Sequence, residues 1–397
     1  MHVLATRLVL ACFIATTPVL AVEKPVLVGI DAEFSLPNST SAQAIERGAR
    51  TAVDEINQMG GVLGGRPLEV VITDNRSMPA RAEANLAQLA ERPDLVAVLC
   101  GRFSTAVLDA LPLIHEKRLV FLDPWASADG IIDNNYQPNY AFRLSLRDVD
   151  AAPLLMRRAL AKHAGKIGIL AVNNAWGRSN VHAAEVYAAA NGAPTIVDEQ
   201  WHNFGDRSLI QQYLKLRNAG AQAVILAAAE MEGAAFVREL AGLPPAMRLP
   251  VISTWGVTGG RFLEEAGQGL FAIDFSVVQS FSFEHVPPAR LAGFMDSYAR
   301  LYGPTEAAKI IPATGVAQAY DLIHILARAI DLAGSTDRPR VRDALERVRD
   351  YQGLVRDFPE PFDARRHEAL GEADLFIATY RRDGSLAPVA DHGTISK

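Results

Sequence analysis

Residues 26–79 constrain the fold more than any other part of the chain. An apolar run begins at Val26, and a helical pattern follows over residues 45–56, where apolar side chains recur every three to four positions. A glycine cluster, GGVLGG, ends that pattern, and a second apolar run begins at Leu68. This order predicts a βαβ unit, in which two parallel strands lie side by side and the helix crosses one face of the sheet.

The rest of the chain repeats this alternation of strand-like and helix-like segments. Single cores stop growing at about 250–300 residues, and this chain has 397, so we expect two lobes. The predicted fold class is α/β, with two doubly wound parallel-sheet lobes. The predicted strands span residues 26–30, 68–73, 95–100, 119–122, 166–172, 195–197, 223–228, 250–253 and 270–275, and two later helices span Pro288–Tyr302 and Ala313–Ala333.

Charge and motif content exclude several classes of function. The sequence has 39 Lys and Arg against 45 Asp and Glu, a formal net charge of −6, and no long basic block, so we expect no nucleic-acid partner. It contains no G-x-S-x-G, H-E-x-x-H, Walker lysine or paired Cys-x-x-Cys motif, and GGVLGG follows a helix rather than a strand. We therefore predict that the protein is not an enzyme. A secreted α/β enzyme that uses acidic residues is the alternative.

The N-terminus is typical of a secretory signal peptide. Residues 1–21 combine a weakly positive start at His2 and Arg7, an apolar run, and Ala21 at the expected cleavage site. The apolar run is shorter than the ~20 residues of a membrane-spanning helix, and no later stretch qualifies, so we expect an exported protein that is not embedded in a membrane. Removal of the signal leaves one cysteine, Cys100, which we expect to be buried and unreactive.

Residues 48–85 carry a resemblance to a known family. Their spacing resembles that of periplasmic solute-binding proteins of the leucine/isoleucine/valine-binding type, the type I periplasmic binding proteins, which serve ABC importers. The matching residues are Gly48, Ala49, Ala52, Ile56, Asn57, Gly60, Gly61, Gly64, Leu68, Asp74, Pro79, Ala82 and Asn85. The opening segment, with Asp31 and Glu33 in place of small residues, also resembles a subgroup encoded beside pyrroloquinoline-quinone-dependent (PQQ-dependent) alcohol dehydrogenase systems, some of which use lanthanides.

The resemblance implies a division of the chain and a mode of action. It implies an N-lobe of residues 22–144 and 277–348, a C-lobe of residues 145–276 and 349–397, and three crossing segments between them. The protein would be a periplasmic monomer that captures a small ligand by hinge closure and delivers it to an ABC transporter permease, with no cofactor required. A secreted ligand-sensing module for a membrane receptor is a further alternative.

The resemblance also implies which loops hold the ligand. Ser104 and Thr105 follow the third predicted strand, where the family binds a ligand carboxylate; a plain helix cap is the alternative. Ser127 ends a Pro-x-x-Ser loop after the fourth strand, and Trp125 in that loop replaces a smaller residue. In the C-lobe, Trp176 stands where relatives pack an aromatic side chain on the ligand, with core packing as the alternative.

Two further C-lobe positions argue against an ordinary amino acid as ligand. Amino-acid-binding relatives hold the ligand ammonium with a Tyr and a Glu, and Ala229 and Trp255 occupy those positions here. A buried ammonium without a carboxylate partner loses several kcal/mol. We therefore expect leucine, isoleucine and valine to bind poorly, unless the neighbouring Glu230 takes that role.

Acidic residues follow several strands of the predicted first sheet. Parallel strands end at one edge, so Asp31, Glu33 and Asp123 are expected to share a crevice. One interpretation is a site for a hard cation, Ca²⁺ or a lanthanide, as the ligand or part of it. The other is that arginines neutralise the acids and the ligand is a small organic anion. The local candidates for such pairing are Arg76, Arg102 and Arg143.

Overall fold

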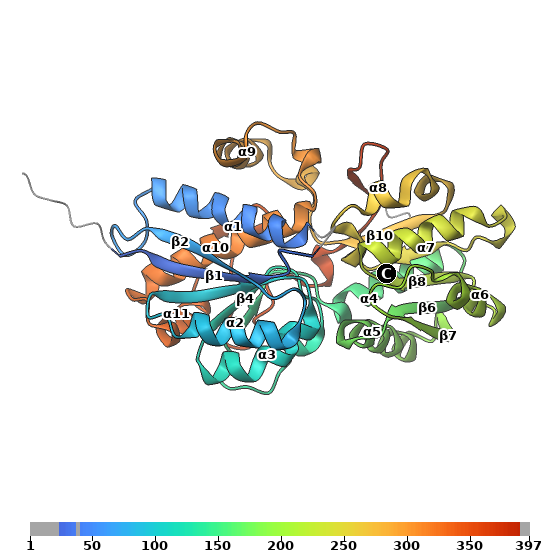
Figure 1. The fold of residues 1–397 in the computed structure, drawn as a ribbon, viewed down its shortest axis with the longest axis horizontal. Helices are drawn as coiled ribbons and strands as arrows, with labels where there is room; N and C mark the ends of the chain where they lie inside the picture. The colour runs from blue at the N-terminus through green and yellow to red at the C-terminus, as the bar shows by residue number, and fades with distance from the viewer. Residues whose placement is uncertain (1–23, 37–39, 390–397) are drawn as a thin grey trace, which may run out of the picture.

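A five-stranded parallel sheet forms the core of the first lobe (Figure 1). The structure, a computed structural model, describes residues 24–36 and 40–389, and the predicted signal peptide lies outside them. In sheet order the strands are β2 (Leu68–Asp74), β1 (Val26–Ala32), β3 (Leu95–Cys100), β4 (Val120–Asp123) and β5 (Ala141–Arg143). The predicted βαβ unit is confirmed, because β1 and β2 pair in parallel along their whole length.

Helices cover both faces of this sheet. One face carries α1 (Ser41–Gln58), α10 (Ala313–Ala333) and α11 (Arg338–Leu345), with α9 (Pro288–Tyr302) beside α1, and the other carries α2 (Pro79–Ala90) and α3 (Ser104–Glu116) (Figure 1). Helices α1 and α10 approach closely because Gly48 has no side chain. A Cβ at that position would lie 2.0 Å from the carbonyl oxygen of Val316. The two helices predicted for residues 288–333 are confirmed.

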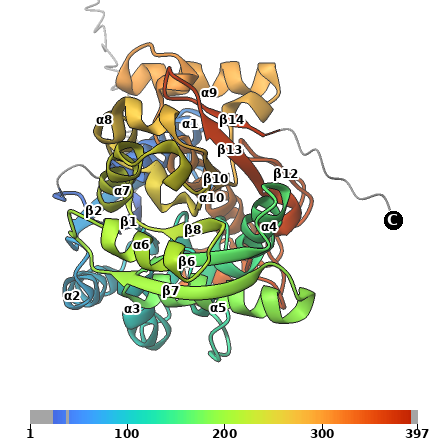
Figure 2. The ribbon, with the colours of Figure 1, turned by 90° about the vertical axis from the view of Figure 1, so that its right-hand side faces the viewer.

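A seven-stranded sheet forms the core of the second lobe (Figure 2). Its order is β14 (Leu386–Pro388), β13 (Phe376–Tyr380), β10 (Phe275–Gln279), β9 (Val251–Ser253), β8 (Ala223–Ala227), β6 (Lys166–Val172) and β7 (Thr195–His202). The strands from β10 to β7 are parallel, and β13 and β14 add an antiparallel edge. Its helices are α4 (Asp148–Ala161), α5 (Ala175–Asn191), α6 (Ile210–Asn218), α7 (Glu230–Gly242) and α8 (Phe262–Ala266). The predicted α/β class with parallel-sheet lobes is confirmed.

The strand predicted at residues 270–275 is wrong. Those residues begin in a 3₁₀ helix, Gly267–Ala272, and β10 begins only at Phe275. Gly269 lets this turn pack on α7, since a Cβ there would lie 3.0 Å from the Ala241 side chain. A short apolar run is compatible with a strand or a buried turn, so its hydrophobicity alone does not separate the two.

Two features bear on where the lobes divide. Strand β10 stays in the second sheet to Gln279, so the predicted boundary at residue 277 falls inside it. The hairpin of β11 (Tyr351–Gln352) and β12 (Asp357–Phe358) packs on α10, where Asp321 accepts hydrogen bonds from the Tyr351 hydroxyl at 2.7 Å and the Val355 N–H at 2.8 Å. The lobe bounds stay a prediction. Across residues 24–36 and 40–389, no helix is both long and apolar enough to cross a membrane.

Candidate functional site

A stacked pair of tryptophans joins the two lobes. Trp125 lies in the loop after β4, and Trp255 begins a short 3₁₀ turn after β9. Their ring centroids are 5.1 Å apart with 24° between the ring planes, and both side chains are buried. Because one ring comes from each lobe, the stack exists only when the lobes are in contact.

Two small cavities lie beside this stack, with volumes of about 20 and 30 Å³. Each has room for about one water molecule. Residues that line both cavities are Arg102, Phe103, Trp176 and Ala229; Ser104 and Thr105 line the first, and Trp125, Ser127 and Trp255 line the second. The structure therefore brings together six of the predicted ligand residues, Glu230 being the exception, while their contact with a ligand stays a prediction.

The hydroxyl groups at the start of α3 offer a place for an oxygen-bearing ligand. Ser104 Oγ accepts a hydrogen bond from the Ala128 N–H at 3.2 Å. Thr105 Oγ1 is buried and has no hydrogen-bond partner among the residues that the structure describes. A buried hydroxyl without a partner is uncommon, and the first N–H groups of a helix also lack partners within the helix. This end of α3 can therefore donate hydrogen bonds to a carboxylate or carbonyl oxygen.

Trp176 lies against the backbone of the loop that carries Trp255. It follows Asn174, whose side chain caps α5 by accepting a hydrogen bond from the Gly177 N–H at 2.9 Å. A Cβ at Gly256 would lie 2.4 Å from the Trp176 ring, so the ring reaches this position only because residue 256 is glycine. Trp176 therefore forms a wall of both cavities rather than part of the C-lobe core.

Arg102 connects the lobes electrostatically. Its guanidinium forms an ion pair with Glu230, the first residue of α7, and the two side chains are only 6% and 3% exposed. Arg102 Nε also lies 3.7 Å from Glu33 Oε1. Within the described part of the chain, Arg102 Nε and Glu33 Oε2 are buried without hydrogen-bond partners. Burial alone would lower the pKa of Arg102, but the negative charges of Glu230 and Glu33 reverse the effect and raise it.

Asp31 is held by neutral donors. Its carboxylate accepts hydrogen bonds from Thr73 Oγ1 at 2.8 Å, Asn75 Nδ2 at 2.8 Å and Asn85 Nδ2 at 2.7 Å. Burial raises the pKa of Asp31 to about 6, and the three hydrogen bonds limit that rise. The side chain therefore anchors the loop and helix that follow β2.

Asp123 is fully buried at the end of β4. It accepts a hydrogen bond from the Trp125 N–H at 2.9 Å, and Cys100 Sγ lies 3.2 Å away. Burial raises the pKa of Asp123 to about 7, although the charge of Arg143 opposes the rise. Burial also raises the pKa of the Cys100 thiol, and the predicted burial of that residue is confirmed.

These contacts do not fit a site for a hard cation. Such ions take six or more oxygen ligands, whereas Asp31 and Asp123 face hydrogen-bond donors and Glu33 faces Arg102. The described residues contain no group of three or more His, Cys, Asp or Glu side chains that could hold a metal ion. Pairing with an arginine applies to Glu33, which faces Arg102, whereas neutral donors bind Asp31 and the Trp125 N–H binds Asp123. The cation hypothesis stays a prediction for experiment.

Three side chains near the cavities were not identified from the sequence. Phe103 and Phe204 meet edge to face across the first cavity, with ring centroids 5.5 Å apart. Phe103 directly precedes Ser104, so its position after a strand was a usable signal. Asp148, the first residue of α4, is buried, and burial together with the negative charge of Asp129 raises its pKa. Nothing local in the sequence marks Asp148 or Phe204.

Comparison with known sequences gives the class of protein. Residues 25–385 match the family described as periplasmic binding protein, and the chain belongs to that family. A curated relative is the Leu/Ile/Val-binding protein homolog 3 of Brucella melitensis biotype 1, which is 23% identical over 322 residues, covering 79% of this chain and 80% of the relative.

Solved structures share the fold. A type 1 periplasmic binding protein from Bordetella pertussis Tohama I has a TM-score of 0.82 and 23% identity, covering 92% of this chain and 100% of that chain. A solute-binding protein from R. palustris in complex with 4-hydroxybenzoate has a TM-score of 0.76 and 18% identity, covering 92% and 96% of the two chains.

Proposed function

We propose that this protein is the periplasmic solute-binding component of an ABC importer, and that its ligand is a small planar organic anion of the aromatic carboxylate class. The observation that supports this most directly is the interlobe region itself. There, Arg102, Phe103 and Trp176 line both small cavities. The first is also lined by Phe204 and by Thr105, whose hydroxyl has no partner among the described residues, and the second by Trp125 and Trp255. A planar apolar body fits the rings, and a carboxylate fits the donors.

The closed arrangement has to open before such a ligand enters. The two cavities are far smaller than an aromatic ring, and the tryptophan stack lies beside them where the lobes are in contact. In the proposed cycle the lobes separate, the carboxylate binds at the start of α3 and to Arg102, and closure brings the C-lobe rings onto the ligand. A ligand favours closure because it contacts both walls only in that state.

An α-amino acid fits this region less well. Its ammonium needs a carboxylate, and the nearby Glu230 already pairs with Arg102. Ala229 offers no side-chain acceptor. The 4-hydroxybenzoate bound to the R. palustris protein shows that this fold accommodates an aromatic carboxylate, and we extend that class to the present chain by proposal only.

Isothermal titration of the exported protein tests this function. Benzoate or 4-hydroxybenzoate should bind with micromolar affinity, about −8 kcal/mol, and leucine should not bind appreciably. Arg102→Met should abolish binding. Glu230→Gln should strengthen it, because Glu230 competes with the ligand for the guanidinium. Micromolar binding of leucine, or unchanged benzoate affinity in Arg102→Met, would contradict the proposal.

Intrinsic fluorescence provides a second readout. Trp125, Trp176 and Trp255 line the cavities, whereas Trp201 lies on β7. Ligand binding should change the emission, and Trp201→Phe should retain most of that change. Recovery of the ligand unchanged after prolonged incubation distinguishes a binding protein from an enzyme.

A further inference from the structure

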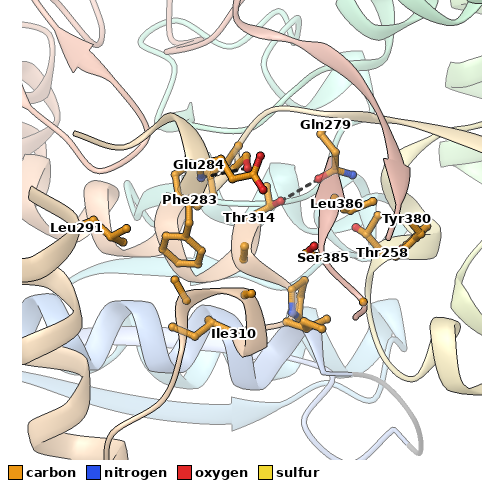
Figure 3. A pocket seen from close by; sticks show the side chains of 18 residues that line it. Thr258, Gln279, Phe283, Glu284, Leu291, Ile310, Thr314, Tyr380, Ser385 and Leu386 are labelled. Atoms are coloured by element: carbon orange, nitrogen blue, oxygen red, sulfur yellow. Dashed lines mark hydrogen bonds between the residues drawn. The ribbon is translucent and has the colours of Figure 1, made fainter. Parts of the chain in front are cut away.

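A separate pocket of about 260 Å³ lies where the lobes meet, beside the end of β10 and the residues that follow it. Figure 3 shows Phe283, Leu291 and Ile310 on one side and Thr258, Tyr380 and Leu386 on the other. The first side belongs to segments around α9 and the start of α10, which pack on the first lobe through α1. Tyr380 and Leu386 belong to the second sheet. Both lobes therefore wall the pocket.

The tryptophan stack lies between this pocket and the small cavities. Thr258, at the pocket wall, ends the 3₁₀ turn that begins with Trp255. On the opposite lobe, Thr314 lines the pocket and its neighbour Gly315 touches the other ring: a Cβ at Gly315 would lie 2.7 Å from the Trp125 side chain. The pocket is thus distinct from the proposed ligand region but shares its dividing wall.

The described residues that line the pocket are mainly apolar and include no Lys, Arg or His. Most of its side chains are aromatic or aliphatic, and its one charged residue, Glu284, is ion-paired with Arg381. A buried polar spot lies at one end, where Thr314 Oγ1 donates to Gln279 Oε1 at 3.1 Å. Gln279 Nε2 uses one N–H to reach the Val278 carbonyl oxygen at 2.8 Å, which leaves its second N–H without a partner among the described residues.

We propose that this pocket is a second binding site, for a neutral and mainly apolar small molecule that carries one hydroxyl or amide group. Its apolar body fills the space between Phe283 and Leu386, and its polar group accepts from Gln279 and donates to Thr314 Oγ1. An anion is disfavoured because Glu284 is the one charged side chain among the described residues that line the pocket. Since both lobes contact the occupant, it stabilises the closed arrangement.

Two matched probes test the site. 4-Ethylphenol is neutral at pH ~7 and 4-ethylbenzoate is anionic, and they share the same apolar body. In calorimetry, Ala307→Phe should weaken 4-ethylphenol binding by at least about tenfold by filling the pocket. Ala308→Trp, at an exposed lining position, should do the same with less risk to folding. Ala292→Phe, at an exposed position of α9 outside the lining, is the control and should have no effect.

Further measurements locate the probe and separate this proposal from the first. Binding of 4-ethylphenol should survive Arg102→Met, and the pocket-filling variants should leave 4-hydroxybenzoate binding at the cleft intact. By reciprocity, 4-ethylphenol should strengthen binding of any ligand that closes the lobes. The proposal is overturned if Ala307→Phe and Ala308→Trp both bind 4-ethylphenol like the wild type, or if Trp176→Leu alone abolishes that binding. Failure of benzoate to bind would overturn the proposed function and leave this site standing.

Discussion

Two buried arginine–glutamate pairs in this molecule have different surroundings. Arg143, on β5, donates from Nε to Glu368 at 2.8 Å and from Nη1 to the carbonyl oxygens of Ala126 and Ala128 at 3.1 and 3.0 Å. Its Nη2 reaches the second oxygen of Glu368 at 2.5 Å. Arg102 pairs with Glu230 across the lobes, but its Nε is unpartnered within the described residues. Every nitrogen of the Arg143 guanidinium has an acceptor, whereas Arg102 Nε has none among the described residues, so we call the first pair saturated and the second under-satisfied.

This difference indicates that the Arg143–Glu368 pair stabilises the fold, whereas the Arg102–Glu230 pair stabilises the closed arrangement of the lobes. Arg143 joins β5 to the segment that carries Glu368. A backbone bridge between the two residues places that segment against the first sheet, although the predicted bounds put residue 368 in the C-lobe. Water cannot replace those contacts without local unfolding. Arg102 and Glu230 lie on different lobes, so lobe separation exposes both charges to water. We infer that the under-satisfied pair lets the lobes open at modest cost, while the saturated pair is retained in both states.

The largest expected effect comes from breaking the saturated pair. Arg143→Met should lower the free energy of unfolding by about 3–5 kcal/mol, because it leaves Glu368 as an uncompensated buried charge. Urea denaturation with a fitted midpoint measures this. Arg147→Met is the matched control: its side chain is 27% exposed and it pairs with Asp150 on the surface. That variant should change stability by less than about 1 kcal/mol. Equal losses in the two variants would contradict the distinction.

The next largest effect is a pH dependence of folding stability that arises from Asp123, a residue influenced by the charge of Arg143. The folded-state pKa of Asp123, about 7, lies above its usual value of 3.8, so between these values the folded protein binds more protons than the unfolded chain. Stability from this group is therefore present at low pH and falls as pH rises toward about 7. Asp123→Asn cannot ionise and should be more stable than the wild type at pH ~8, by on the order of 4 kcal/mol.

The free energy of unfolding of the wild type and of Asp123→Asn should be measured at both pH ~4 and pH ~8. Near pH 4 the wild-type Asp123 is protonated in the folded state, so the variant and the wild type should differ little there. Subtracting the two curves removes the contributions of all other titrating groups. A difference that does not change between pH ~4 and ~8 would show that Asp123 titrates normally despite its burial.

The contrast between the two pairs also explains what the sequence could predict. Hydrophobic periodicity is local, so the core strands and the helices at residues 288–333 were predictable. Contacts between distant residues were not: Arg102 and Glu230 are 128 positions apart, and each was assigned a separate role. The edge strand β5 has three residues, too few for a period-two pattern to be recognised. Loop residues such as Ser104 and Trp125 were identified through their resemblance to the family's sequence spacing. That spacing indicates which residues lie near the site, but not the direction in which their side chains point.

A smaller effect on stability is expected from the under-satisfied pair. Arg102→Met should lower the free energy of unfolding by about 1 kcal/mol or less, because opening lets water solvate Glu230. Its main consequence should be a shift toward the open arrangement, seen as an increased radius of gyration in small-angle X-ray scattering. Glu230→Gln should shift the same equilibrium. A loss of stability as large as that of Arg143→Met would mean that Arg102 holds the fold rather than the closed state.

The smallest effect is expected at Glu33, whose Oε1 lies 3.7 Å from Arg102 Nε and also accepts a hydrogen bond from Ser41. In Glu33→Gln the amide oxygen can still accept the hydrogen bond from Ser41. The substitution also removes one of the two negative charges beside Arg102, so the free energy of unfolding should change by less than about 1 kcal/mol. The same variant tests the cation hypothesis. A bound ion at a hundredfold excess over its Kd would stabilise the protein by about 2.7 kcal/mol. If Arg102 neutralises the cluster, Ca²⁺ and La³⁺ should leave the melting temperature of metal-stripped wild type unchanged. A metal-dependent rise that Glu33→Gln and Asp31→Asn both remove would instead establish the cation site.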